Sequence, residues 1–67
     1  MEIWHVTVFG NNQAFDEDRV GLEPAKQWAL QKVHELGYNG EITWHLEGDA
    51  CTATISPQLA VRIQRRT

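Results

Sequence analysis

Residues 41–55 read EITWHLEGDACTATI and predict a β-hairpin. Apolar and polar side chains alternate over residues 41–47, and the alternation resumes after the Gly48-Asp49 pair, from Cys51 to Ile55. A period of two places the apolar side chains on one face of a sheet and the polar side chains on the other. We therefore expect a sheet that is covered on one face only, which leaves its second face free for a partner.

Residues 3–9 predict an earlier strand, because the same alternation puts Trp4 on one face and His5, Thr7 and Phe9 on the other. Residues 10–23 follow as a long connection that contains an acidic run at 16–18. We expect Phe15 and Val20 to pin this connection to the rest of the chain, with the acidic side chains facing water.

Residues 24–36 predict a helix. Pro24 suits the first turn, where its missing N–H does no harm, and apolar side chains recur at helical spacing up to Leu36. Gly37 stands where a C-terminal cap belongs.

The segment 57–66 has two interpretations. Leu59, Val61 and Ile63 alternate with polar or small residues, which predicts a strand, whereas Ser56-Pro57 is also a good start for a short helix. The clean alternation and the β-branched side chains favour the strand. The sequence thus predicts one α+β domain over residues 1–67. One helix packs on one face of a small, mostly antiparallel sheet, in the order β-α-β-β with a fourth strand at the C-terminus.

Size and composition narrow the possibilities. A chain of 67 residues buries a small core, and its one cysteine excludes an internal disulfide. Cys51 is expected to face the core as a small apolar side chain. Stability should then come from an aromatic core or from self-association, and Trp4, Trp28 and Trp44 all fall on predicted inner faces.

The net charge of −3 argues against a protein that coats nucleic acid. Met1 leads directly into a strand, no stretch approaches the roughly 20 apolar residues of a membrane span, and the cysteine is single. These features predict a cytoplasmic protein without a membrane partner.

Candidate sites are few. His5 and His45 could share the polar face for acid–base work, or hold a metal with Glu41 or Glu47, but two surface histidines are the simpler interpretation. The run from Asp16 to Gln27 begins like a calcium loop and then lacks the required ligands. No catalytic residue, metal site or cofactor is therefore expected.

Residues of the polar face and the arginines near the C-terminus are the candidates for binding a partner. They are His5, Thr7, Phe9, Thr43, His45, Arg62, Arg65 and Arg66.

The order strand, helix, strand, strand within roughly seventy residues resembles the layout of dodecin, a small flavin-binding protein that assembles into hollow shells. His45-Leu46 before the Gly48-Asp49 turn and the long final segment are similar in arrangement. The chain departs from dodecin at Tyr38-Asn39-Gly40, where a flavin-stacking aromatic run belongs. The resemblance implies a flavin-binding oligomer.

The sequence favours a non-catalytic interaction module that binds a protein, a second copy of itself included, through the open face or an open edge of its sheet. Viral and accessory proteins that modulate a host factor are often of this kind. The alternatives are the dodecin-like flavin-binding oligomer and a nucleic-acid-binding module that uses the C-terminal arginines.

Overall fold

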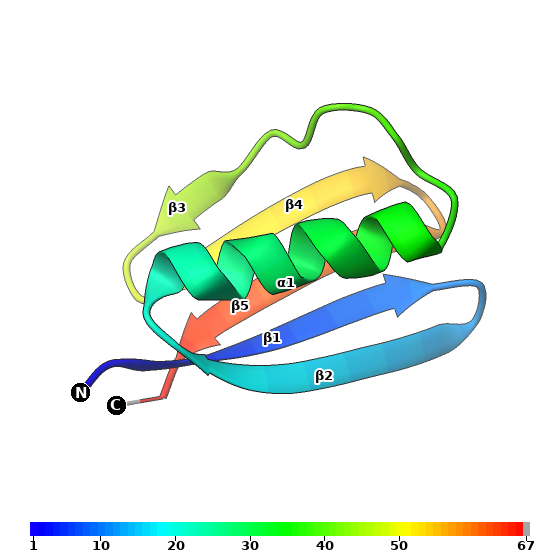
Figure 1. Ribbon diagram of the computed structural model, residues 1–67. Coiled ribbons are helices and arrows are strands. Elements are labelled where there is room, and N and C mark those ends of the chain that lie inside the picture. Colours follow the sequence, from blue (N-terminus) through cyan, green and yellow to red (C-terminus); the bar gives the residue numbers. More distant parts are fainter. Residues whose placement is uncertain (67) are drawn as a thin grey trace.

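The computed structural model describes residues 1–66 and has an α+β fold, in which one helix packs against a five-stranded antiparallel sheet (Figure 1). Its elements are β1 (Ile3–Gly10), β2 (Gln13–Val20), α1 (Leu22–Glu35), β3 (His45–Glu47), β4 (Ala50–Ser56) and β5 (Leu59–Arg65). The strands lie in the order β2-β1-β5-β4-β3. The predicted fold class and the helix on one face are confirmed, but the element order is β-β-α-β-β-β, with one more strand than expected.

The additional strand is β2, which occupies residues predicted to be a long connection. Asn11 and Asn12 have φ values of 53° and 62°. Two consecutive left-handed residues form the tight turn that suits a two-residue hairpin, and asparagine tolerates this conformation. Phe15 lies on the helix side of the sheet, opposite Val8, whereas Val20 is exposed and does not pin the segment. The acidic run that suggested a loop is part of an edge strand.

The predicted helix over residues 24–36 is confirmed as α1. It begins two residues earlier than expected, at Leu22, so Pro24 lies within its first turn. Ala25, Ala29 and Val33 are buried against the sheet. Gly37, with φ 100°, follows the helix in the left-handed conformation that the cap position requires.

The predicted hairpin of residues 41–55 forms only in part. β4 is present, but β3 is limited to His45–Glu47, and residues 41–44 are not part of the sheet. This connecting segment lies against the helix side. The Tyr38 hydroxyl donates a hydrogen bond to the Glu41 carbonyl over 2.9 Å, and Lys26 Nζ lies 5.7 Å from the centre of the Trp44 ring. Residues 41–44 therefore pack near the helix, although their alternation predicts that they pair with β4.

Segment 57–66 contains the strand β5 after a turn at Pro57-Gln58, as the alternation predicts, and β5 lies between β1 and β4 at the centre of the sheet. The core consists of apolar side chains from β1, α1, β4 and β5: Trp4, Val6, Val8, Ala25, Ala29, Val33, Cys51, Ala53, Val61 and Ile63. Trp28 and Trp44 pack against it while partly exposed. The inward orientation of Cys51 and of the tryptophans is confirmed. Leu46 was expected to be inside as well, but it is 66% exposed because α1 packs against β1, β2 and β5 and does not reach β3.

Candidate partner-binding face

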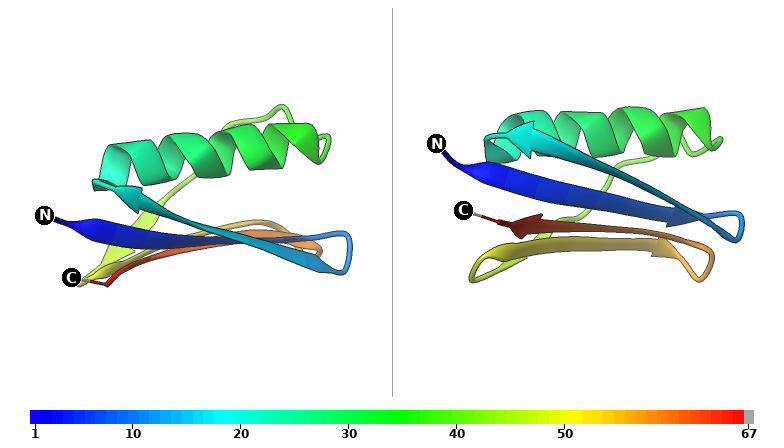
Figure 2. Two further views of the ribbon diagram at one scale, coloured as in Figure 1. Left: turned by 60° about the horizontal axis from the view of Figure 1, so that its bottom comes forward. Right: turned by 90° about the horizontal axis from the view of Figure 1, so that it is seen from below.

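The sheet face opposite α1, called the open face below, has no covering element among residues 1–66 (Figure 2). Its residues follow from the strand register: Ile3, His5, Thr7, Phe9, Ala14, Asp16, Asp18, Val20, His45, Glu47, Ala50, Thr52, Thr54, Ala60, Arg62 and Gln64. Residues directly opposite one another on neighbouring strands share a face, so each row of the ladder crosses the whole sheet. One such row runs Asp16, Thr7, Arg62, Thr52, His45.

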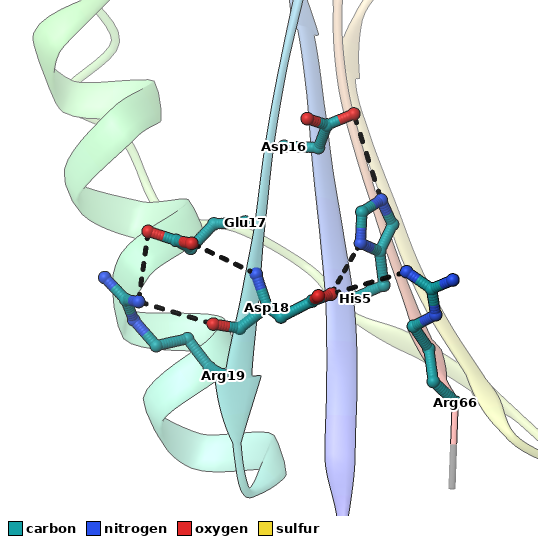
Figure 3. Close-up of polar contacts among 6 residues, drawn as sticks. All are labelled: His5, Asp16, Glu17, Asp18, Arg19 and Arg66. Atoms are coloured by element: carbon teal, nitrogen blue, oxygen red, sulfur yellow. Dashed lines mark hydrogen bonds and ion pairs between the residues drawn. The ribbon is translucent and has the colours of Figure 1, made fainter.

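A charged cluster occupies the β2 side of the open face (Figure 3). His5 Nδ1 lies 2.7 Å from Asp18 Oδ1, and His5 Nε2 lies 3.9 Å from Asp16 Oδ2. Arg66 Nη1 lies 3.7 Å from the same Asp18 oxygen. The hydrogen bond with His5 lowers the pKa of the Asp18 carboxyl below its ordinary value of 3.8, and the charge of Arg66 acts in the same direction. Asp18 is therefore engaged by both His5 and Arg66.

A shallow hollow of about 250 Å³ lies beside this cluster, between β1 and β5. It is lined by His5, Thr7, Phe9, Arg62 and Gln64. Arg62 Nη2 donates a hydrogen bond to Gln64 Oε1 over 2.8 Å, and Arg62 forms no ion pair within residues 1–66. The hollow therefore combines an aromatic ring with a cation whose charge is not compensated.

Phe9 is the aromatic side chain of the open face, and it is 47% exposed. Its neighbours across the ladder are Ala14 on β2 and Ala60 on β5, whose small side chains leave the ring uncovered. Phe9 also lines a second, larger hollow of about 630 Å³ between the turn at Asn11-Asn12 and the turn at Pro57-Gln58. One exposed ring thus borders two hollows.

The candidate residues from the sequence are only partly brought together. His5, Thr7, Phe9 and Arg62 meet at the hollow between β1 and β5. His45 lies on the same face but three strands away from His5, a separation of roughly 14 Å at the usual strand spacing, so the two imidazoles do not form a pair. Thr43 is exposed in the segment before β3.

The arginines near the C-terminus are divided between the two faces. Arg65 lies opposite Trp4, on the helix side, and its Nη2 is 2.8 Å from Asp49 Oδ1. Arg66 lies beside Asp18 on the open face. The three arginines therefore do not form one patch.

Sequence reasoning missed Asp16, Asp18 and Ala14 as members of the open face. The signal was present, since Gly10-Asn11-Asn12 is followed by eight residues without proline or glycine. The acidic run hid it, because exposed edge strands carry few apolar side chains.

The described residues contain no cluster of His, Cys, Asp and Glu side chains that could hold a metal ion. Cys51 is buried, and burial raises the pKa of its thiol, which keeps it in the unreactive protonated form. Within residues 1–66 no helix has the length and apolar character needed to span a membrane.

Comparison with known proteins found no matching protein-family model, no similar curated protein and no similar solved structure.

Proposed function

We propose that this chain is a non-catalytic module that binds a protein partner through the open face, with Phe9 as the anchor. The observation that carries the proposal is the exposed Phe9 ring between two alanines, bordering two hollows on a face without a covering layer. Aromatic and arginine side chains are the residues that most often dominate binding energy at protein interfaces.

The side chains that line the hollow between β1 and β5 indicate which groups a partner would present to it. Phe9 favours an apolar side chain, and the uncompensated guanidinium of Arg62 favours a carboxylate beside it. The partner segment would therefore carry an acidic residue next to an aliphatic or aromatic one. Thr7 and Gln64 add polar groups that fix its orientation.

Nucleic acid fits this face less well. Binding to single strands requires several exposed rings on which bases stack, together with a basic surface. Among residues 1–66, Phe9 is the one Phe, Tyr or Trp ring on the open face. Asp16 and Asp18 lie on the same face, and Arg65 and Arg66 are engaged by carboxylates. The layout on which the likeness to dodecin rested also differs from the observed order of elements.

The test compares two exposed apolar side chains on opposite sides of the molecule. Phe9→Ser removes the anchor, and Leu30→Ser is the matched control, because Leu30 is 43% exposed on the helix. Arg62→Glu reverses the charge in the hollow. The four immobilised proteins are exposed to the same cell lysate, and a retained protein is then purified and titrated against each variant.

The proposal predicts a partner that binds the wild type and Leu30→Ser equally but loses about tenfold to a hundredfold in affinity with Phe9→Ser and Arg62→Glu. Equal binding by all four proteins would contradict it. Parallel titrations with a labelled single-stranded RNA and with a flavin test the other two functions. Loss of RNA binding in Arg62→Glu, without a protein partner, would replace the proposal by a nucleic-acid function.

A further inference from the structure

On the open face, β1 has one neighbouring strand of each charge. The residues that flank Thr7 across the ladder are Asp16 on β2 and Arg62 on β5. Two strand spacings separate this carboxylate from this guanidinium, roughly 10 Å across the sheet. The two opposite charges therefore lie in one row, on either side of β1, and do not pair within the molecule.

Both charges are accessible to a partner. The Asp16 side chain is 62% exposed, and its contact with His5 Nε2 is as long as 3.9 Å. Arg62 is exposed as well and forms no ion pair within residues 1–66. Each of them would gain from an opposite charge on a surface that packs onto the open face.

The next row of the open face has the same arrangement about β1, in size instead of charge. Phe9 lies on β1, with Ala14 on one side of it and Ala60 on the other. The two methyl side chains leave room beside the exposed ring for a second ring, and aromatic pairs in offset or edge-to-face contact are favourable.

A second copy of this chain presents the matching pattern when it is turned about an axis along β1. A two-fold rotation about such an axis, in the plane between two facing sheets, places β1 over β1 and β2 over β5 of the second copy. Asp16 of each copy then faces Arg62 of the other, so one interface gains two ion pairs. Phe9 meets Phe9, with the alanines around them.

Other two-fold arrangements of the same face do not match the charges. An axis across the strands places β2 over β2, which brings acidic side chains together. An axis along β5 places Arg62 over Arg62 and Asp18 over Glu47. An axis between β1 and β5 leaves Asp16 and Arg62 opposite threonines.

From this pattern we infer that the open face binds a second copy of this chain, in a two-fold dimer with its axis along β1. The inference rests on the proposed function, because it names the partner of the same face. Facing sheets pack about 10 Å apart with their strands crossing at about 30°, so the rows nearest the crossing point meet best. The row of Thr7 and the row of Phe9 are consecutive on this face.

The size of the overlap determines the strength of the dimer. Only β2, β1 and β5 lie under the second copy in this arrangement, and β4 and β3 extend beyond it. An interface of three strands falls at the lower end of specific interfaces, so we expect a dissociation constant of about 10–100 μM.

The first test is sedimentation equilibrium of the wild type between about 1 μM and 1 mM. Asp16→Arg and Arg62→Asp each place like charges opposite one another, so each should weaken the dimer at least about tenfold. Phe9→Ser should weaken it as well. Leu30→Ser is the control, because Leu30 is 43% exposed on the helix, and it should leave the dimer unchanged.

The second test mixes the two charge-reversed variants in equal amounts. In a heterodimer of Asp16→Arg with Arg62→Asp, each reversed residue again faces an opposite charge, so the mixture should form a dimer that neither variant forms alone. Salt should weaken this dimer. The matched control mixes Asp49→Arg with Arg65→Asp, which make the same changes in net charge at an ion pair outside the interface. This mixture should associate no more strongly than its components.

A wild type that remains monomeric over the whole range, a dimer that both reversals leave unchanged, or a monomeric mixture of the two reversed variants would overturn the inference. If a reversed variant does not fold, Asp16→Asn and Arg62→Gln replace the pair, and each should weaken the wild-type dimer. A monomeric wild type that retains a lysate protein, and loses it in Phe9→Ser, would end this inference and leave the proposed function in place.

Discussion

His5 and Asp18 lie directly opposite each other on β1 and β2 and are joined by a 2.7 Å contact between His5 Nδ1 and Asp18 Oδ1. The contact links the central part of the sheet to its edge strand. It also lies on the face that carries Thr7, Phe9 and Arg62.

The lowered pKa of Asp18 predicts a dependence of stability on acid. Because the folded-state pKa lies below the ordinary value of 3.8, ionised Asp18 stabilises the fold above that value, and this contribution is lost as the pH falls through the lowered pKa. The thermal midpoint of the wild type should decrease when the pH is lowered below about 4, and the decrease should be smaller in Asp18→Asn.

The cause of this shift is tested by a carbon NMR titration of the Asp18 carboxyl. The hydrogen bond with His5 is the largest cause, so His5→Gln should raise the pKa of Asp18 toward 3.8. An unchanged titration in His5→Gln would show that the contact with His5 does not lower the pKa.

The elements that were predictable from the sequence are those whose periodicity is determined by the core. β1 and β5 bury alternate side chains such as Val6 and Ile63, and α1 buries a narrow stripe at Ala25 and Ala29. In each case the pattern of apolar residues is the direct consequence of packing, so it could be recognised without coordinates.

β2 and β3 were not predictable in the same way, because edge strands depend on pairing more than on burial. β2 contributes Phe15 as an apolar side chain to the helix side, and its acidic residues are divided between the two faces. In residues 41–44 the alternation was correct, but Ile42 and Trp44 pack near the helix instead of continuing β3. The alternation alone does not determine whether this segment pairs with β4 or packs near the helix.

The candidate site shows the same division. His5, Thr7 and Phe9 follow from the alternation of one strand. Arg62 was also a candidate from the sequence, but its place beside them at the hollow, together with Gln64, is seen only in the structure. The separation of Arg65 from Arg66 required the register between β1 and β5, which no single strand specifies. The alternation within one strand therefore does not show which residues of distant strands lie side by side.

The turn between β1 and β2 provides a test of the strand that the sequence pattern hid. Asn12 has φ 62°, a conformation that costs a β-branched residue about 1–2 kcal/mol. Asn12→Val should lower the free energy of unfolding by that amount, and Asn12→Gly should preserve or increase it. Urea unfolding measures both, and equal stability of the two variants would contradict the tight turn.

Cys51 provides a test of the core. The thiol is buried and its pKa is raised, so it should react slowly with a disulfide reagent at neutral pH and rapidly in denaturant. In Ile63→Ala, which should cost about 2–5 kcal/mol, the reaction in native buffer should accelerate because the unfolded population increases. Rapid reaction of the folded wild type would show that Cys51 is accessible.

The Asp18 N–H donates to Glu17 Oε1, and Arg19 Nη1 donates to the Asp18 carbonyl and lies 3.1 Å from Glu17 Oε2. We call these three contacts the Glu17–Arg19 clasp, and we predict that removing its two half-buried side chains alters association more than stability. In the double variant Glu17→Ala, Arg19→Ala, the outward N–H and C=O of Asp18 lose their partners. Its amide should exchange faster, and sedimentation should reveal association beyond that of the wild type, which strengthens with salt, because salt screens the repulsion between acidic edges. Glu23→Ala, Lys26→Ala is the matched control, since it removes an ion pair of 3.9 Å from the helix and changes no residue of β2. If both double variants sediment like the wild type and share its Asp18 exchange rate, the clasp does not protect the edge.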